Sequence, residues 1–156
     1  MGRKFLLLSA VLFSIVSGGQ IFKSGDYKGW HHVKSMVIHD PKHPLYNPFG
    51  GIHHVYANMK AVSTTKKGEG RRFPEGAVLA FLLYEAEEAG GAFVEGKKKI
   101  EAFMVKDSRR YADTGGWGFF AYDGRGKSIV KDMKRDCFNC HAQVKKLDYV
   151  FSLYKE

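Results

Sequence analysis

The chain has 156 residues, a length typical of one domain. Hydrophobic residues make up 44% of it, which excludes the compositions of disordered and collagen-like chains. The 25 Lys and Arg residues against 16 Asp and Glu give a net charge of +9, but the basic residues are dispersed, so we expect a solvated surface and no nucleic-acid partner. Two cysteines are too few for a disulfide scaffold or a four-cysteine zinc site.

The first residues have the pattern of a signal peptide. Arg3 and Lys4 form a positive start, Phe5 to Val16 is mostly apolar, and small residues that follow offer a cleavage site. The apolar stretch is shorter than the roughly 20 residues that a membrane-spanning helix needs. We therefore expect residues 1–19 to be removed on export to the periplasm, which leaves residues 20–156 as one domain without stable membrane insertion. An uncleaved anchor is the alternative.

The first half of the exported chain predicts a helix, a loop, a strand and a second helix. Apolar residues recur at helical spacing between Gly25 and Ile38, which predicts a helix there. Prolines and glycines then predict a loop. Ile52 to Ala57 has the pattern of a short strand, and Asn58 is suited to cap a helix that runs toward Lys67.

The second half is richer in strand signals. Ala77 to Tyr84 is an apolar run that periodicity cannot assign, and its Ala, Leu and Glu content favours a helix. Ile100 to Val105 and Trp117 to Tyr122 are rich in aromatic and branched residues, which predicts strands. Asp123 to Gly126 predicts a turn, and Ile129 to Tyr154 a helical stretch. The whole predicts an α+β domain.

Both cysteines fall in one motif, Cys137-Phe138-Asn139-Cys140-His141, which is the c-type haem attachment pattern. Its two thiols can reach the two vinyl groups along one porphyrin edge, and the histidine that follows then lies under the iron as the proximal ligand. We therefore predict one covalently attached haem c. A redox-active cysteine pair and a zinc site are the weaker alternatives, because the motif is not set in a βαβ pattern and further zinc ligands are missing.

The sixth position of the iron decides between functions. An electron carrier needs a second strong ligand, either His or Met, opposite His141. Ten residues of these types are candidates: His31, His32, His39, His43, His53, His54, Met36, Met59, Met104 and Met133.

Several segments of the chain follow one another in a familiar order and spacing. They are Phe73 to Val78, Val105 to Ala112, Gly116 to Phe120, Cys137 to His141, and Asp148 to Phe151. Together they resemble the cytochrome P-460 and cytochrome c′-beta family. The resemblance implies a mainly antiparallel β-sheet with flanking helices, a haem bound near the C-terminus, a homodimer, and a five-coordinate iron with an open distal face. It also implies that the apolar run at 77–84 is a strand.

Two activities divide that family. Members of the P-460 type cross-link a lysine to the haem and oxidise hydroxylamine, whereas the c′-beta type lacks the cross-link and binds nitric oxide or carbon monoxide. By the resemblance, the lysine position falls on Phe81, and no lysine occurs within residues 68–96. The carboxylate of the enzyme falls on Ala102, beside Glu101, and Phe49 matches the second distal phenylalanine. The resemblance is therefore to the c′-beta type.

The expected function is non-enzymatic gas binding on a mono-haem periplasmic cytochrome. Phenylalanines at the distal side offer no hydrogen-bond donor and disfavour water on the iron, because its polar groups would go unpaired there. The alternatives are a hydroxylamine-oxidising oxidoreductase that passes electrons to a partner cytochrome, and an electron carrier with a His or Met sixth ligand. The predicted cofactor-binding residues are Cys137, Cys140, His141, Phe49 and Phe81, and the predicted iron ligand is His141.

Overall fold

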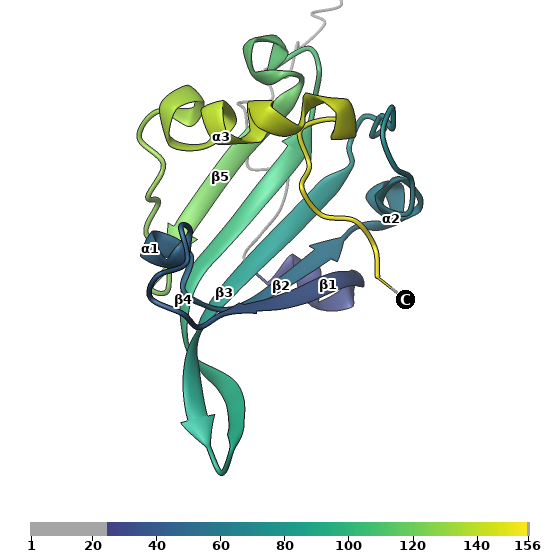
Figure 1. The fold of residues 1–156 in the computed structure, drawn as a ribbon. Helices are drawn as coiled ribbons and strands as arrows, with labels where there is room; N and C mark the ends of the chain where they lie inside the picture. The colour runs from purple at the N-terminus through teal and green to yellow at the C-terminus, as the bar shows by residue number, and fades with distance from the viewer. Residues whose placement is uncertain (1–24, 156) are drawn as a thin grey trace, which may run out of the picture.

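One antiparallel sheet of five strands organises the structure, a computed structural model that describes residues 25–155. The expected signal peptide at residues 1–19 lies outside the described residues. Each strand pairs with the next one along the chain, so the sheet is a simple meander, which confirms the α+β expectation (Figure 1). The strands are β1 (His31–Ile38), β2 (Gly51–Ala57), β3 (Val78–Ala89), β4 (Ala92–Lys106) and β5 (Trp117–Asp123).

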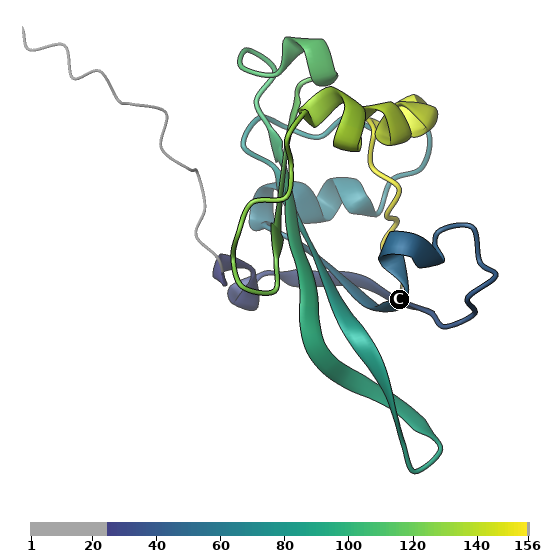
Figure 2. The ribbon, with the colours of Figure 1, turned by 90° about the vertical axis from the view of Figure 1, so that its left-hand side faces the viewer.

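Short helical segments connect and cover the strands. The α1 helix and the C-terminal helical segment lie on the same side of the sheet, as Figures 1 and 2 both show. No helix among residues 25–155 is long and apolar enough to cross a membrane. The helical segments are η1 (Asp26–Gly29), α1 (Tyr46–Phe49), α2 (Met59–Thr65), η2 (Ala112–Thr114), η3 (Lys134–Phe138), α3 (Asn139–His141) and η4 (Ala142–Leu147).

Alternate residues of a strand point to opposite faces of the sheet. In this sheet, apolar side chains occur on both faces. The front face packs against α2 and the C-terminal segment, and we define it by Val55, Leu79, Phe81, Met104 and Phe119. The back face packs against Tyr27 and Trp30, and we define it by Val78, Ala80, Leu82, Phe103 and Val105.

The apolar run at 77–84 forms the buried part of β3. The helix that its composition favours is therefore wrong, and the strand that the family resemblance implies is confirmed. The central strands are covered on both faces, so β3 needs apolar residues at consecutive positions and shows no alternation. Burial on two faces overrides the modest helix propensity of Ala and Leu.

The helix expected between Gly25 and Ile38 is wrong. A short 3₁₀ turn, η1, buries Tyr27, and the chain then enters β1. Val33 is fully buried on the front face, whereas Val37 is exposed, so the four-residue spacing between them does not mark one buried helical face. A register shift between His32 and Lys34 disturbs the alternation by which a strand is recognised.

The other local predictions hold over most of their length. The strands expected at 52–57, 100–105 and 117–122 are confirmed within β2, β4 and β5. The turn after β5 is closed by a hydrogen bond from the Gly126 amide to the Asp123 carbonyl of 2.9 Å. The long C-terminal helix is confirmed only between Lys134 and Leu147, and beyond it the tail is extended and its Lys155 amide bonds the Val33 carbonyl at 3.1 Å.

Asn58 caps α2 as predicted and also joins that helix to β3. Its side-chain oxygen accepts hydrogen bonds from the amides of Ala61 and Val78, each at 3.1 Å, and its side-chain nitrogen donates to the Gly76 carbonyl at 3.0 Å. We expect Asn58→Ala to lower the free energy of unfolding by about 1–3 kcal/mol, since it removes a helix cap and further part-buried bonds. Urea denaturation measures this. Gln143→Ala, which removes an exposed amide, is the control, and equal effects of the two would contradict the assignment.

Candidate haem-binding site

The two cysteines of the attachment motif lie on consecutive helical turns above the front face. Cys137 is in η3 and is half-buried against the front-face cluster, while Cys140 is in α3 and exposed. Both are free thiols. Burial, with a smaller contribution from the charge of Asp136, raises the pKa of the Cys137 thiol to about 11. A redox-active cysteine pair needs a lowered thiol pKa, so the environment of Cys137 disfavours that alternative.

His141 is oriented by a hydrogen bond that leaves one ring nitrogen available. Its Nδ1 lies 2.7 Å from the carbonyl oxygen of Tyr149, and because a carbonyl only accepts, Nδ1 carries the proton. Nε2 then presents a lone pair, the form in which imidazole binds a metal. Burial lowers the pKa of His141, which favours this neutral form. The ring contacts Phe119 and Phe151, with centroid distances of 4.9 and 5.2 Å.

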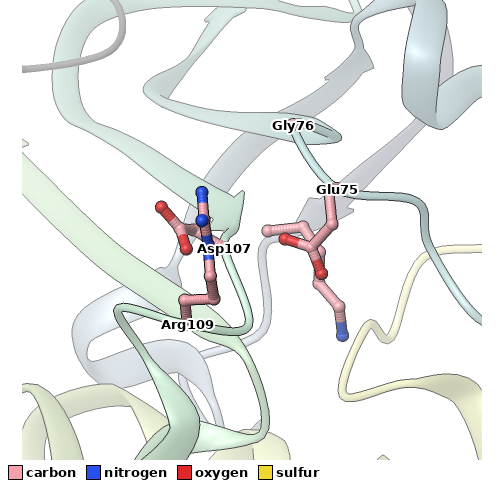
Figure 3. Close-up of a pocket in the computed structure, with 5 residues that line it drawn as sticks. Glu75, Gly76, Asp107 and Arg109 are labelled. Atoms are coloured by element: carbon pink, nitrogen blue, oxygen red, sulfur yellow. The ribbon is translucent and has the colours of Figure 1, made fainter.

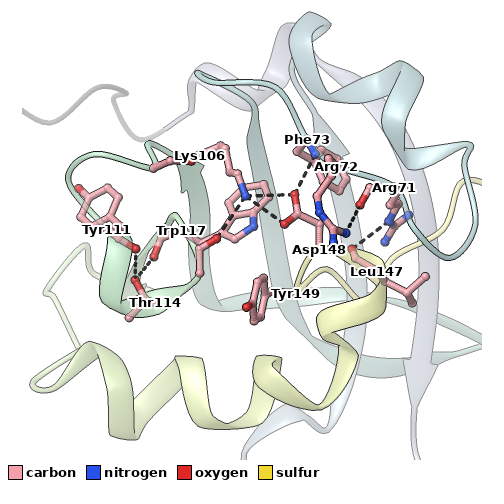
Figure 4. Close-up of polar contacts among 12 residues, drawn as sticks. Arg71, Arg72, Phe73, Lys106, Tyr111, Thr114, Trp117, Leu147, Asp148 and Tyr149 are labelled. Atoms are coloured by element: carbon pink, nitrogen blue, oxygen red, sulfur yellow. Dashed lines mark hydrogen bonds and ion pairs between the residues drawn. The ribbon is translucent and has the colours of Figure 1, made fainter.

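The Tyr149 carbonyl is held in place by a buried ion pair next to it in the chain. The Asp148 carboxylate lies 3.0 Å from the ammonium of Lys106 on β4 and accepts a 2.8 Å hydrogen bond from the Phe73 amide. Both charged side chains are buried, with exposed fractions of 3% for Asp148 and 7% for Lys106. Figure 4 shows this pair between the sheet and the C-terminal segment. Asp148 and Tyr149 both have positive φ, which ends the helical segment and turns the chain at this point.

The buried side chain of Arg71 holds the same turn through hydrogen bonds. The guanidinium of Arg71 donates to the carbonyls of Leu147 and Ser152, each at 3.0 Å, and to that of Val150 (Figure 4 shows the bond to Leu147). Sequence reasoning did not identify Arg71, Lys106 or Asp148 as site residues. Lys106 and Asp148 do fall inside segments that carry the family resemblance, which was the available signal. Their function here is to position the acceptor that orients His141.

The two predicted distal phenylalanines are brought together on the front face. Phe49 ends α1 and Phe81 lies on β3, and their rings meet edge to face with centroids 6.1 Å apart. Phe81 shares the front face with Phe119, which contacts His141. The structure therefore places the phenylalanine pair and the histidine on one side of the sheet, with Phe81 on β3 and His141 in α3.

Small side chains lie in the row that Phe81 begins. Phe81 pairs with Ala102 on β4, and Ala102 pairs with Ala121 on β5. All three are only half-buried, although flanking front-face residues such as Leu79 and Phe119 are buried. A flat ring system fits over such a row, since the alanines do not project from the sheet and remain uncovered by this chain. The residues present thus fit a haem whose edge lies at the two cysteines.

The candidate sixth ligands are scattered. His32 and His54 belong to a hydrogen-bonded chain through Ser35, with distances of 2.8 and 2.7 Å, and His54 also lies 3.0 Å from Glu95. The remaining candidates have other partners or surroundings: His31 contacts the Met59 sulfur, His39 stacks on Phe93, His43 accepts from the Leu45 amide, Met133 accepts from the Phe119 amide, Met104 packs on the front face, and Met36 is exposed. Only His53 contacts the phenylalanine pair.

The carboxylate next to the expected enzyme position points away from this site. Glu101 alternates with Ala102 along β4, so it belongs to the back face with Phe103. It is 2% exposed, lies 2.5 Å from the Lys98 ammonium and accepts a hydrogen bond from the Gly25 amide. At this point of β4 the front face carries the Ala102 side chain, and the Glu101 carboxylate lies on the back face.

A separate surface pocket of about 390 Å³ lies where β3 begins and β4 ends. Two of its charged side chains already have partners: Glu75 accepts two hydrogen bonds from Ser108, and Lys106 pairs with Asp148. Figure 3 shows Glu75 facing the segment with Asp107 and Arg109 across the opening. These interactions tie the loop before β3 to the end of β4, so we interpret the pocket as structural.

Comparison with known families agrees with this geometry. The family model described as Cytochrome P460 matches residues 24–152. The chain belongs to the cytochrome P460 family. A haem cofactor follows from membership of the cytochrome P460 family, and the matched range contains the attachment motif, Phe49, Phe81 and the buried ion pair. A search of curated proteins found no match.

Proposed function

We propose that this member of the cytochrome P460 family is an exported gas-binding cytochrome that holds one haem c, has no sixth protein ligand, and takes up nitric oxide or carbon monoxide. Cys137 and Cys140 would attach the haem through thioethers, and His141 would bind the iron through Nε2. When bound, the haem supplies an iron with an open coordination position. The observation that carries the proposal is the edge-to-face pair of Phe49 and Phe81 on the face that also presents His141.

The proximal residues would fix the strength and direction of the iron–histidine bond. The hydrogen bond from Nδ1 to the Tyr149 carbonyl makes Nε2 a better donor and prevents rotation of the ring. Contacts with Phe119 and Phe151 would restrict the ring further.

The distal residues would select small neutral ligands. Phenyl rings offer neither a donor nor an acceptor of conventional hydrogen bonds, so a bound water or anion would lose its hydrogen bonds there. Nitric oxide and carbon monoxide depend much less on such bonds. The phenylalanine pair would thus leave the iron five-coordinate at rest and admit uncharged diatomic gases.

Two features favour gas binding over hydroxylamine oxidation. Phe81 occupies the position at which the resemblance expects the cross-linking lysine, and a phenyl ring cannot form that bond. Glu101, the nearest carboxylate on β4, faces the back of the sheet and is paired with Lys98. Neither the cross-link nor a proton-accepting carboxylate on the front face of β4 is then present to support the enzyme chemistry.

Absorption spectra of the purified protein in both oxidation states test the proposal. We expect high-spin spectra that change when nitric oxide or carbon monoxide is added. A low-spin six-coordinate spectrum would identify an electron carrier instead, and a red-shifted ferrous band typical of a cross-linked haem would identify the enzyme type. Mass spectrometry of exported protein tests covalent attachment of one haem, removal of residues 1–19 and, by native mass, the proposed homodimer.

Phe81→Ala is expected to open the distal side. Carbon monoxide should associate with the ferrous protein about tenfold faster, which corresponds to about 1.4 kcal/mol of barrier, and water should bind the ferric iron. Flash photolysis and the ferric absorption spectrum measure these effects. Phe93→Ala is the control, because Phe93 is half exposed at the far end of the β3–β4 hairpin. Unchanged ligand kinetics in the Phe81 variant would contradict the distal assignment.

A further inference from the structure

A histidine is buried beside the phenylalanine pair. His53 lies on β2 and is 3% exposed, with Val55 and Phe81 as neighbours on the front face. A buried imidazole is costly unless its polar atoms are bonded, so its partners are informative. None of the roles proposed above uses this residue.

His53 contacts both members of the pair. Its ring meets the Phe81 ring edge to face, with centroids 5.2 Å apart. Its Nε2 lies 2.5 Å from the carbonyl oxygen of Phe49, and because the carbonyl only accepts, Nε2 carries the proton and donates. One side chain therefore ties the end of α1 to the strand that carries Phe81.

The position of Phe49 depends on such a contact. It ends a helix of only four residues, and the chain from residue 39 to residue 48 is exposed. The following carbonyl, that of Gly50, is held by the Lys99 ammonium at 2.7 Å. Lys99 thus anchors the segment just after Phe49, whereas His53 bonds the Phe49 peptide itself and touches the ring that Phe49 meets.

We propose that His53 is a positioning residue that holds Phe49 against Phe81 and thereby sets how readily water and diatomic gases reach the iron. The effect on access to the iron rests on the proposed function, whereas the contact of His53 with Phe49 and Phe81 does not. The hydrogen bond to Phe49 needs a proton on Nε2. A neutral imidazole provides it in the tautomer that carries its proton on Nε2. Burial lowers the pKa of His53 despite the opposing effect of the hydrogen bond to Phe49, and the nearby His54, Lys34 and Lys99 act in the same direction as burial, which favours the neutral ring.

A pair of substitutions of similar size separates the hydrogen bond from simple packing. His53→Gln keeps an N–H donor near the position of Nε2, and His53→Met fills similar space without one. We expect carbon monoxide to associate about tenfold faster with the ferrous Met variant than with the parent protein, and the Gln variant to stay within about threefold of the parent. We also expect water on the ferric iron in the Met variant alone. His31→Met, at an exposed histidine, is the control.

Crystal structures of the haem-loaded variants provide a readout that does not depend on gas binding. We expect the Phe49–Phe81 centroid distance to stay near the present 6.1 Å in the parent protein and the Gln variant, and to increase in the Met variant. Equal geometry and equal rates in the Gln and Met variants would overturn the inference. If the parent protein itself failed to bind carbon monoxide, the proposed function would fail, while the ring geometry of the variants would still decide whether His53 positions Phe49.

Discussion

Asp148→Ala will lower the free energy of unfolding by about 3–5 kcal/mol, because it leaves the Lys106 ammonium buried without its counter-ion. The same change removes the acceptor of the Phe73 amide and loosens the turn that carries the Tyr149 carbonyl. Guanidinium denaturation of the haem-loaded protein, followed by far-ultraviolet circular dichroism, measures the loss. The haem spectrum of the folded variant should also shift, since the acceptor for His141 is no longer fixed.

Asp113→Ala is the matched control for this prediction. Asp113 also pairs with a lysine, Lys134, but at 4.0 Å and with both side chains exposed. Exposed pairs contribute little, so we expect a change of less than about 1 kcal/mol. A double replacement of Asp148 and Lys106 by apolar residues should recover part of the loss, because it removes the uncompensated charge. Equal stability of the Asp148 and Asp113 variants would show that the buried pair does not anchor the turn.

We expect His141→Ala to remove the proposed proximal ligand and to abolish the imidazole-bound spectrum of the iron. The substitution removes the ring that contacts Phe119 and Phe151, and the Tyr149 carbonyl remains there as an acceptor. Free imidazole added to the variant should therefore restore the parent spectrum in large part. Resonance Raman detection of the iron–nitrogen stretch measures both the loss and the recovery.

His43→Ala serves as the control, because His43 lies in an exposed loop and accepts a hydrogen bond from the nearby Leu45 amide. The prediction would fail if His141→Ala kept the parent spectrum, since another residue would then be the ligand. It would also fail if imidazole restored nothing in a variant that had retained its haem and its fold.

The sequence predicted those parts of the fold that depend on local chemistry. Strands rich in aromatic and branched residues, the Asn58 cap and the turn after β5 all appear near their expected positions. The errors arose where tertiary burial decides. The apolar run of β3 is a strand because both of its faces are covered, and β1 is a strand because it completes the sheet beside β2.

For the candidate site, the motif and the family resemblance identified the residues proposed to contact the haem, but not the residues that hold them in place. Arg71 reaches carbonyls more than seventy positions away in the chain, and Lys106 reaches Asp148, which is 42 positions away. No local pattern marks such contacts. His53 was only one of ten candidate iron ligands, and its bond to the Phe49 carbonyl depends on how the loop before β2 folds back on the sheet.

The Nδ1 proton of His141 is donated to the Tyr149 carbonyl. The adjacent Asp148 side chain binds Lys106 of β4 and the Phe73 amide in the loop before β3. Unfolding of β4 and of the loop before β3 would release the Tyr149 carbonyl. The imidazole would then rotate or dissociate from the iron. The visible absorbance of the haem should consequently report on folding, and it should change together with the loss of the sheet.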